Sequence, residues 1–505
     1  MSKINKVVKA SVLLIMGTIL AKALGFAREL IVAYRFGAGS VSDAFVLTNS
    51  IPTLVFCSVA AAININYIPY YHRIDGEEER NRFTSNLTNI SMIVLLIGCL
   101  IINIFPKLVL KIFATGLPAE TERYAVVMLR IVVFSIVPII LSHLYQAYLQ
   151  ANESFIGTAL YGVITNIAVI LFTFLATEEK YYVLSIGTIV SHVVGLAPVF
   201  FAVRKRTKFK YYAYVRFTDQ KIRDLILLTL PLMLEDIASS MSLLVDRNLA
   251  SFLDKGTISG LGYAGTIGNI ASTMIATAIM TVTFPMFSRM IATGEQKQFY
   301  FQFEKYAIVI SYLLGPISVF MILNANDIIT FIFEHGAFTS AATKLVSESM
   351  ICYAVGVLPM GLQSYLIRGF YAMQDTKTPV KIKVFALLCN ITLNLISVKF
   401  IRHMGIALST SVSYIIAYFL LAQSLKKNHG ISNIGRITKE GGISLLLSIM
   451  PGIAVYFLFH HLLTFDYLLI KILSEGALYL ILYGFMMFVM RKEAFLSIIR
   501  IAKRG

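Results

Sequence analysis

The sequence predicts an all-α polytopic membrane protein with about 14 transmembrane helices. Hydrophobic residues make up 57% of its 505 residues and charged residues only 14%, whereas a soluble protein carries about 25% charged residues. The apolar residues also form continuous runs of about 20 residues, which is the length of a membrane-spanning helix. A barrel strand would instead be a shorter segment of alternating character, so a helical bundle is predicted.

Fourteen apolar runs, separated by polar segments, are long enough to cross the bilayer. The first run lacks a small-residue cleavage site, so we expect it to remain as a span. The four cysteines lie in apolar runs, where we expect packing and no disulfide framework. The predicted spans are 8–34, 42–68, 86–113, 122–149, 155–177, 181–203, 222–252, 259–288, 301–333, 342–371, 380–400, 405–425, 441–462 and 466–490.

The two halves of the chain resemble each other. Asn166 and Asn390 stand in matching sequence contexts, as do Gly39 and Gly256, and the two separations are nearly equal. Each separation covers six predicted spans, so the halves have the same orientation, and such parallel repeats are typical of transporters. We therefore expect a six-helix lobe in 1–217, a second six-helix lobe in 218–435, and two additional helices with a cytoplasmic tail in 436–505.

The basic residues predict the orientation of the chain. Most of the 44 lysines and arginines lie in the segments that are inside when the N-terminus is cytoplasmic, and the positive-inside rule then places both termini in the cytoplasm. The net charge of +17 therefore reflects topology, and no nucleic-acid partner is expected. The longest basic run, 204–223, is expected to contact anionic membrane lipids as well.

Charged side chains inside the first predicted span indicate a substrate site. Lys22, Arg28 and Glu29 lie within an apolar run, and a charge at mid-bilayer costs roughly 3 kcal/mol on insertion scales. Such residues usually face a protein interior or a water-filled cavity. Arg28 therefore predicts an anionic substrate.

No catalytic or ATP-binding constellation stands out, and the protein is not expected to be an enzyme. The chain has no G-x-S-x-G, H-E-x-x-H or Walker A motif. His143 and His192 are single intramembrane histidines, expected to be satisfied core residues. Transport is expected to draw on an ion gradient or the membrane potential, with sodium or a proton as the candidate coupling ion and no other cofactor.

A candidate cation site combines one carboxylate with neutral oxygen ligands. Asn390 and Asn394 are four residues apart and share a helix face. Thr410 lies in the next predicted span, and Asp246 lies in the seventh. Asp246 also adjoins Arg247, so the alternative for Asp246 is a plain ion pair. For Asn390 and Asn394 the alternative is hydrogen bonding between helices.

Three motifs resemble those of a known family. They are Leu24-Gly25-Phe26-Ala27-Arg28 continuing through Phe36-Gly37-Ala38-Gly39 and Asp43-Ala44-Phe45 to Pro52, then Phe331 to Thr339, and then Arg368 to Pro379. In these motifs the chain is similar to the MurJ/MviN lipid II flippases of the multidrug/oligosaccharidyl-lipid/polysaccharide exporter superfamily. The resemblance extends over nearly the whole chain. The resemblance implies fourteen helices and alternating access, and it implies that the two additional helices in 436–505 form a lipid-groove element.

The resemblance also implies a function in peptidoglycan biosynthesis. The protein is expected to be a flippase, acting as a monomer in the bacterial cytoplasmic membrane, that moves a polyprenyl-pyrophosphate-linked saccharide such as lipid II to the outer leaflet. The expected substrate-binding residues are Lys22, Arg28, Glu29, Asp43 and Arg368. Asp246, Asn390, Asn394 and Thr410 match positions that bind sodium in some members of the family.

Two departures from the family pattern leave the substrate open. Phe56 stands where the family often has an arginine, and Thr266 replaces the arginine of an Ala-Asp-Arg sequence. The expected cavity is therefore less cationic. A flippase for a capsule or exopolysaccharide repeat unit is the main alternative, and a drug/cation antiporter of the same superfamily is a further one. A membrane glycosyltransferase would need a large outer loop, and the predicted outer loops are short.

Overall fold

The computed structural model describes residues 3–431 and 434–502, with side chains described for 16–56, 66–227, 240–431 and 434–499. Every regular element in this described part is a helix, which confirms the predicted fold class. The elements are α1 (Lys3–Phe36), α2 (Ser40–Arg73), α3 (Glu77–Ile104), α4 (Pro106–Phe113), α5 (Ala119–Val132), η1 (Val133–Ser135), α6 (Ile136–Ala151), α7 (Ile156–Leu175), α8 (Val183–Arg206), α9 (Gln220–Ala250), α10 (Thr257–Ala292), α11 (Gln296–Leu323), α12 (Ala325–Phe333), α13 (Ser340–Ala372), α14 (Lys377–His429), α15 (Ile434–Phe457), η2 (Leu458–Leu462), α16 (Leu468–Met490) and α17 (Lys492–Ala502).

Each of the fourteen predicted spans falls on one or more of these helices. Within the described residues, ten helices are long and apolar enough to cross a membrane. One of them, α14, contains two predicted spans, because non-helical backbone at Ile401 and Arg402 separates its halves. Arg402 has a φ of 49°, a conformation that marks a turn in the chain and not a continuous helix.

Some predicted spans are interrupted where the backbone chemistry requires it. Pro106 lacks an N–H, so it is suited to the first position of a helix, and α4 begins there after a break at Phe105. A similar break at Asn324 separates α11 from α12. The short helix α17 was not among the predicted spans.

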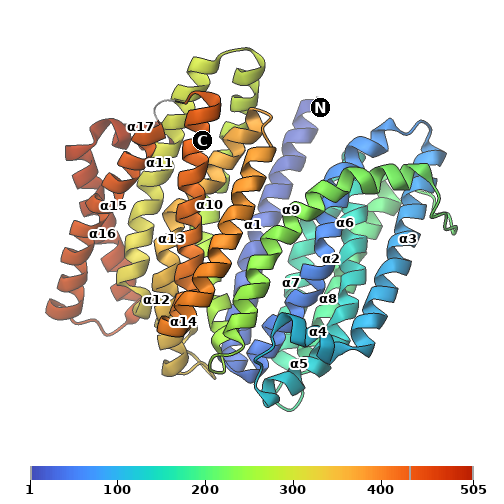
Figure 1. The fold of residues 1–505 in the computed structure, drawn as a ribbon, viewed down its shortest axis with the longest axis horizontal. Coiled ribbons are helices and arrows are strands. Elements are labelled where there is room, and N and C mark those ends of the chain that lie inside the picture. The colour runs from blue at the N-terminus through green and yellow to red at the C-terminus, as the bar shows by residue number, and fades with distance from the viewer. Residues whose placement is uncertain (1–2, 432–433, 503–505) are drawn as a thin grey trace. The chain divides into compact units, whose positions relative to one another are not determined.

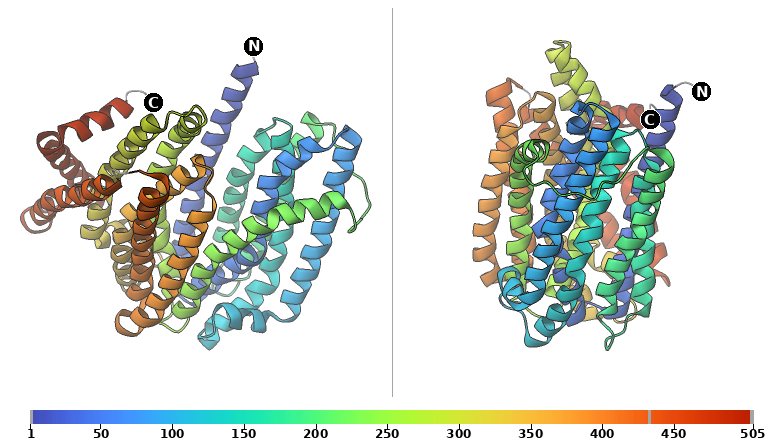
Figure 2. Two further views of the ribbon diagram at one scale, coloured as in Figure 1. Left: turned by 45° about the horizontal axis from the view of Figure 1, so that its top comes forward. Right: turned by 90° about the vertical axis from the view of Figure 1, so that its right-hand side faces the viewer.

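The chain divides into two compact units, Met1–Ser259 with Gly336–Phe338, and Gly260–His335 with Thr339–Gly505. In the first unit, α1 packs on α7, α7 packs on α8, and α2 contacts α5, α6 and α9. Figure 1 and the left view of Figure 2 show α9, in green, running obliquely to α2. Two buried apolar clusters form the core of this unit.

An extended segment between α8 and α9 is fixed to the surface of α3; we call residues 207–217 the strap. Asn81 and Asn86 donate to the carbonyls of Lys208 and Arg216 at 3.3 and 3.0 Å. Asn89 donates to the carbonyls of Tyr212 and Tyr214 as well. The exposed polar peptides of the strap are thus satisfied by side chains of one helix.

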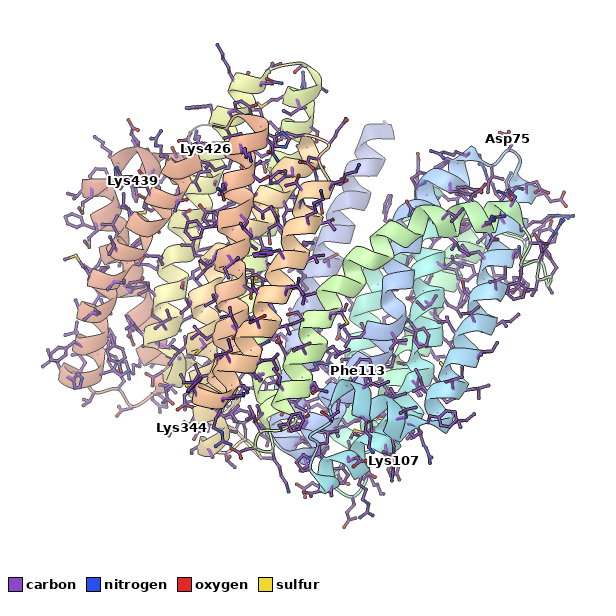
Figure 3. All side chains as sticks on the ribbon, in the orientation of Figure 1. Asp75, Lys107, Phe113, Lys344, Lys426 and Lys439 are labelled. Atoms are coloured by element: carbon purple, nitrogen blue, oxygen red, sulfur yellow. The ribbon has the colours of Figure 1, made fainter. Side chains whose placement is uncertain are left out.

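In the second unit, α13 packs on α14 and α11, and α11 packs on α15. The pair α15–α16 lies beside α11, with α17 against both α16 and α11. Figure 3 shows Lys426 and Lys439 at one end of this unit and Lys344 at the other. In the first unit it shows Asp75 at one end, and Lys107 with Phe113 at the opposite end. The predicted lobe boundaries at 217/218 and 435/436 were based on repetition in the sequence, whereas the two compact units are defined by contacts. The lobe boundaries therefore stay predictions.

Candidate functional site

The charged residues of α1 are only partly covered by their own unit. The side chain of Arg28 is 36% exposed and that of Glu29 is 28% exposed, with 3.8 Å between the guanidinium and the carboxylate. Lys22 is exposed. Arg28 lies eight residues, or about 12 Å of helix, before the end of α1. A partly exposed cation at such depth is stable where water or an anion reaches it.

Arg28 is linked to polar groups of three further helices through His192. Both Arg28 and His143 of α6 interact electrostatically with His192 of α8. The His192 ring in turn shares a hydrogen bond of 2.8 Å with the hydroxyl of Tyr161 on α7. His192 is therefore a partnered histidine, as predicted. Together with α1, these groups make a polar interior in the first unit that no core-packing argument requires.

Small residues bring α1 and α7 close together and so fix the position of Arg28. A Cβ added at Gly17 would lie 2.8 Å from the carbonyl oxygen of Ala159, and one at Gly162 would lie 2.9 Å from the Cβ of Ala21. Asn166 donates to the carbonyl of Ala21 at 3.1 Å. Close approach over small residues, with an added polar contact, is the usual way membrane helices associate.

Asp43, in the first motif, caps the start of α10. It is 4% exposed, and its carboxylate accepts hydrogen bonds from the backbone N–H groups of Gly256 and Ser259, each at 2.7 Å. The Ser259 hydroxyl donates to it at 2.6 Å. A carboxylate at a helix N-terminus is stabilised by unpaired N–H groups and by the helix dipole. The structure thus gives Asp43 a structural role, and its expected contact with substrate stays a prediction.

The glycines of the first two motifs meet within the first unit. The N–H of Ala337 donates to the carbonyl of Tyr34 at 2.8 Å. Gly37 and Gly336 have φ values of 58° and 65°, and a Cβ on either would collide with the backbone of the other segment. Glycine is needed at both positions because it alone tolerates this conformation and this approach.

Glu334, in the second motif, joins α12 to α13 within the second unit. Its carboxylate accepts hydrogen bonds from the hydroxyls of Ser340, Thr343 and Thr330 at 2.6, 2.8 and 3.0 Å. The hydrogen bonds from Ser340 and Thr343 lower the pKa of Glu334 below its ordinary value. The carboxylate is therefore held ionised beside the first turn of α13.

The third motif contains a turn and an exposed cation. Asp375 accepts a hydrogen bond from the backbone N–H of Thr378 at 3.0 Å, and its other oxygen lies 3.2 Å from the His429 ring. Burial raises the pKa of Asp375, but these hydrogen bonds outweigh it and the net shift is downward. Arg368 is exposed, and its guanidinium lies 5.8 Å from the centre of the Phe284 ring. A cation over an aromatic face is held in place without losing its charge.

Three of the four predicted sodium ligands lie together in α14. The Asn394 amide donates to the Asn390 oxygen at 3.2 Å, and the Asn390 amide contacts the Thr410 hydroxyl at 3.4 Å. Asn390 and Asn394 are buried. The two halves of α14 are thus paired by polar side chains, as the interhelical alternative also predicts. Asp246 belongs to the other unit, so its part in a sodium site stays a prediction.

At the two positions where the family arginines are missing, the side chains are uncharged. One position, Phe56, is in the first unit and the other, Thr266, is in the second. Phe56 packs on the first-unit core, and its ring lies 2.8 Å from the position of a Cβ added at Gly98. Thr266 is half-buried in α10. The space next to α3 is therefore filled by an aromatic ring and not by a guanidinium.

The sequence did not reveal a polar cluster in the second unit. Asp327 of α12 lies 2.7 Å from the Lys471 ammonium and 3.1 Å from the His460 ring. Glu475 of α16 completes the cluster and is 1% exposed. These residues stand in three separate apolar runs, so only the fold brings them together.

Comparison with known proteins places the chain in a family. The family model described as "Lipid II flippase MurJ" matches residues 32–475. A probable lipid II flippase MurJ of Rickettsia prowazekii (strain Madrid E) is 26% identical over 493 residues, covering 93% of this chain and 94% of that protein. A lipid II flippase MurJ of Thermosipho africanus (strain TCF52B) is 29% identical over 469 residues, covering 89% and 95%.

Solved structures show the same fold. A lipid II flippase MurJ in an inward closed conformation has a TM-score of 0.81 at 27% identity, covering 94% of this chain and 99% of that one. A multidrug resistance MATE family transporter of the MOP superfamily has a TM-score of 0.65 at 14% identity, covering 83% and 96%. The second likeness concerns the fold alone.

Fold and site therefore define a class: an all-helical, multi-pass membrane transporter with the fold of the MOP superfamily. Within this class, the chain belongs to the lipid II flippase MurJ family. The expectations of family, fold class and a non-enzymatic transport function are confirmed by this membership. Membership also confirms a multi-pass protein of the bacterial inner membrane.

Proposed function

We propose that the protein moves lipid II from the cytoplasmic to the outer leaflet by alternating access, with Arg28 as its principal contact to the substrate. The observation that carries this residue assignment is a partly exposed guanidinium within an apolar run, next to Glu29 and close enough to His192 of α8 to interact with it electrostatically. A pyrophosphate-linked substrate supplies the anion that such a site needs, because guanidinium and phosphate form short, charge-assisted hydrogen bonds.

We assign further residues to substrate binding from their exposure and their neighbours. Lys22 and Arg368 are exposed cations in their own units, so each is available to an anionic headgroup. Glu29 lies beside Arg28 and orients it. We leave Asp43 out of this set, because buried donors of the α10 N-terminus already surround its carboxylate.

One observation favours a second substrate class. Phe56 packs against α3 where the family often carries an arginine, and Thr266 is uncharged. A site with fewer cations also suits another polyprenyl-linked saccharide, such as a capsule or exopolysaccharide unit. The experiment below separates the two, because only lipid II transport restores growth when the host's own lipid II flippase is removed.

We further propose that both termini lie in the cytoplasm and that the protein acts as a monomer. The sidedness within each unit supports this orientation. Lys426 and Lys439 lie at the end of the second unit opposite Lys344, and Asp75 lies at the end of the first unit opposite Lys107. These ends correspond to the segments predicted inside and outside. The orientation is tested by introducing cysteines at positions 107 and 426 and labelling intact cells with an impermeant thiol reagent. Of these two cysteines, only the one at position 107 is expected to react, because that segment is predicted to lie outside.

The test of function is complementation of a bacterium depleted of its lipid II flippase. The wild-type protein is expected to restore growth and the appearance of lipid II in the outer leaflet. Arg28→Ala should lower the transport rate at least about tenfold, since a hydrogen bond to a charged group contributes about 1.5–3 kcal/mol. Arg28→Lys should retain part of the activity, because it keeps the charge and loses the planar fork.

The matched control is Lys344→Ala. Lys344 is 78% exposed at a helix end and its carboxylate partner is 4.0 Å away, so its removal should leave transport unchanged. Full activity of Arg28→Ala at equal membrane abundance would remove Arg28 from the mechanism. Failure of the well-expressed wild-type protein to complement would point to a different lipid-linked glycan.

A further inference from the structure

The second unit contains a cluster of ionisable groups that the transport proposal does not use; Glu475 is buried and the other members are partly buried. Asp327 comes from α12, His460 from η2, and Lys471 and Glu475 from α16. One ligand atom from each of Asp327, His460 and Glu475 lies within 4.8 Å of the others. The cluster joins the C-terminal helix pair to α12.

The cluster has more acceptors than donors. Glu475 is 1% exposed, and its Oε2 has no hydrogen-bond partner within the described residues. The same holds for the side-chain oxygen of the neighbouring Asn324, which is 3% exposed. A buried acceptor without a partner is unfavourable, so two such oxygens in one place indicate a hydrogen-bond donor or a cation that the neighbouring side chains do not supply.

The contacts of His460 point to a cation as well. Its Nδ1 lies 3.0 Å from the carbonyl oxygen of Tyr456, and its Nε2 lies 3.1 Å from Oδ2 of Asp327. A neutral imidazole has one N–H, which the carbonyl requires because it can only accept. The Nε2 lone pair then faces a carboxylate oxygen. This is the arrangement of a metal-ligating histidine, whose second nitrogen donates to a backbone carbonyl.

The charges of the cluster are also unbalanced. Two carboxylates face a single ammonium, that of Lys471, which lies 2.7 Å from Oδ2 of Asp327. With a neutral imidazole, one negative charge is left over, and buried charge of this kind is strongly unfavourable unless it is compensated.

We propose that Asp327, His460 and Glu475 bind a divalent cation of the zinc type, and that Lys471 is a tethered cation that the metal displaces. Imidazole nitrogen with carboxylate oxygen favours zinc over calcium, magnesium or sodium, which prefer all-oxygen sites. Zinc ligands at about 2.0–2.2 Å from the ion are at most about 4.4 Å apart, so binding needs only a small contraction of the cluster. Lys471 is in the first turn of α16, and its long side chain can extend toward the exposed loop before that helix.

The experiment measures zinc binding to the untagged, full-length protein in detergent, by titration calorimetry and by the metal-induced shift in Tm. One zinc ion per chain is expected, together with a rise in Tm. Glu475→Gln and His460→Ala should weaken binding at least tenfold and abolish the rise. Lys471→Met should strengthen binding at least tenfold, because the competing ammonium is gone.

His461→Ala is the matched control, since His461 is exposed and its ring lies tilted against that of Phe457, outside the cluster. It should bind zinc like the wild-type protein. Melting without metal verifies that each variant is folded. Equal zinc affinity in His460→Ala and His461→Ala would overturn the proposal, as would the absence of any zinc-induced stabilisation of the wild-type protein. The cluster would then be an ion-pair network balanced by a proton.

Discussion

At the scale of single residues, each of the three sequence motifs supplies a carboxylate to the start of a helix. Asp43 caps α10, Glu334 contacts the first turn of α13, and Asp375 accepts from the N–H of the second residue of α14. Helix N-termini leave N–H groups unpaired and carry a partial positive charge, so an anion there stabilises the helix by about 0.3–1 kcal/mol. The motifs therefore fix where helices begin as well as what the protein transports.

The stabilisation that Glu334 provides at the start of α13 should depend on pH. Because its pKa is lowered in the folded protein, its contribution to stability is fully present above the unfolded pKa, near 4.5, and is lost as the pH falls through the lowered value. Glu334→Gln should reduce stability by about 1 kcal/mol at neutral pH and by less in acid. Thermal unfolding in detergent at both pH values measures the difference.

Thr343→Val serves as the companion variant because it removes one of the three hydroxyl donors to the same carboxylate. It should reproduce part of the loss at neutral pH. A Glu334→Gln variant whose stability difference from the wild-type protein is the same at both pH values would show that the carboxylate does not act through its charge.

At the scale of elements, the contact between α1 and α7 depends on glycine at some positions and not at others. Gly17→Ala places a methyl group 2.8 Å from a backbone oxygen of α7, whereas Gly25→Ala places it 3.6 Å from the Asn166 side chain, at ordinary contact distance. Both changes raise the helix propensity of α1 equally. The difference in stability between the two variants therefore reports the effect of packing alone. We expect Gly17→Ala to be less stable by about 1–3 kcal/mol, as measured by thermal unfolding; equal stability of the two variants would contradict close packing.

At the scale of the whole molecule, transport needs an energy source. The membrane potential contributes about 2.3 kcal/mol per charge per 100 mV, and a bound cation offers a second source. The paired amides and hydroxyl of Asn390, Asn394 and Thr410 are oxygen ligands suited to sodium. Replacing sodium with N-methyl-D-glucamine should therefore slow wild-type transport several-fold, while Asn390→Ala should be slow and insensitive to sodium.

Thr392→Ala is the control for this experiment, because Thr392 is on the same helix and its hydroxyl donates to the carbonyl of Leu388 in that helix at 2.9 Å. It should keep the sodium response of the wild-type protein. Transport that follows pH and ignores sodium would instead assign the coupling to protons, and Asp246→Asn would then be the variant to examine.

The helices were predictable because hydropathy and length act locally. Each predicted span needed only its own apolar residues, and Pro106 marks the start of α4 by its missing N–H. The site was predictable in part. A charge in an apolar run, such as Arg28, is visible in the sequence, and so is the shared face of Asn390 and Asn394. These signals come from residues close together in the chain.

What the sequence did not reveal depends on contacts between distant segments. The cap made by Asp43 joins residues more than two hundred positions apart, and nothing near Asp43 indicates its partner. Glu475 and His460 lie in separate predicted spans, 466–490 and 441–462. Their meeting with Asp327 follows from how α12 and α16 pack, which hydropathy does not determine.

The strap has a consequence for how this protein can change over time. Asn81, Ser85 and Asn86 of α3 bond to main-chain groups of Lys208, Tyr212 and Arg216, and not to their side chains. Every residue type except proline offers the same main-chain groups. The path of the strap is therefore set largely by α3. The hydroxyls of Tyr211 and Tyr214 also bond to α3, at 2.6 and 3.1 Å, so the strap positions open to change are its exposed basic residues Lys208, Lys210 and Arg216. In lineages whose membranes differ in charge, the charge of the strap surface can therefore change by substitution without altering the path of the strap.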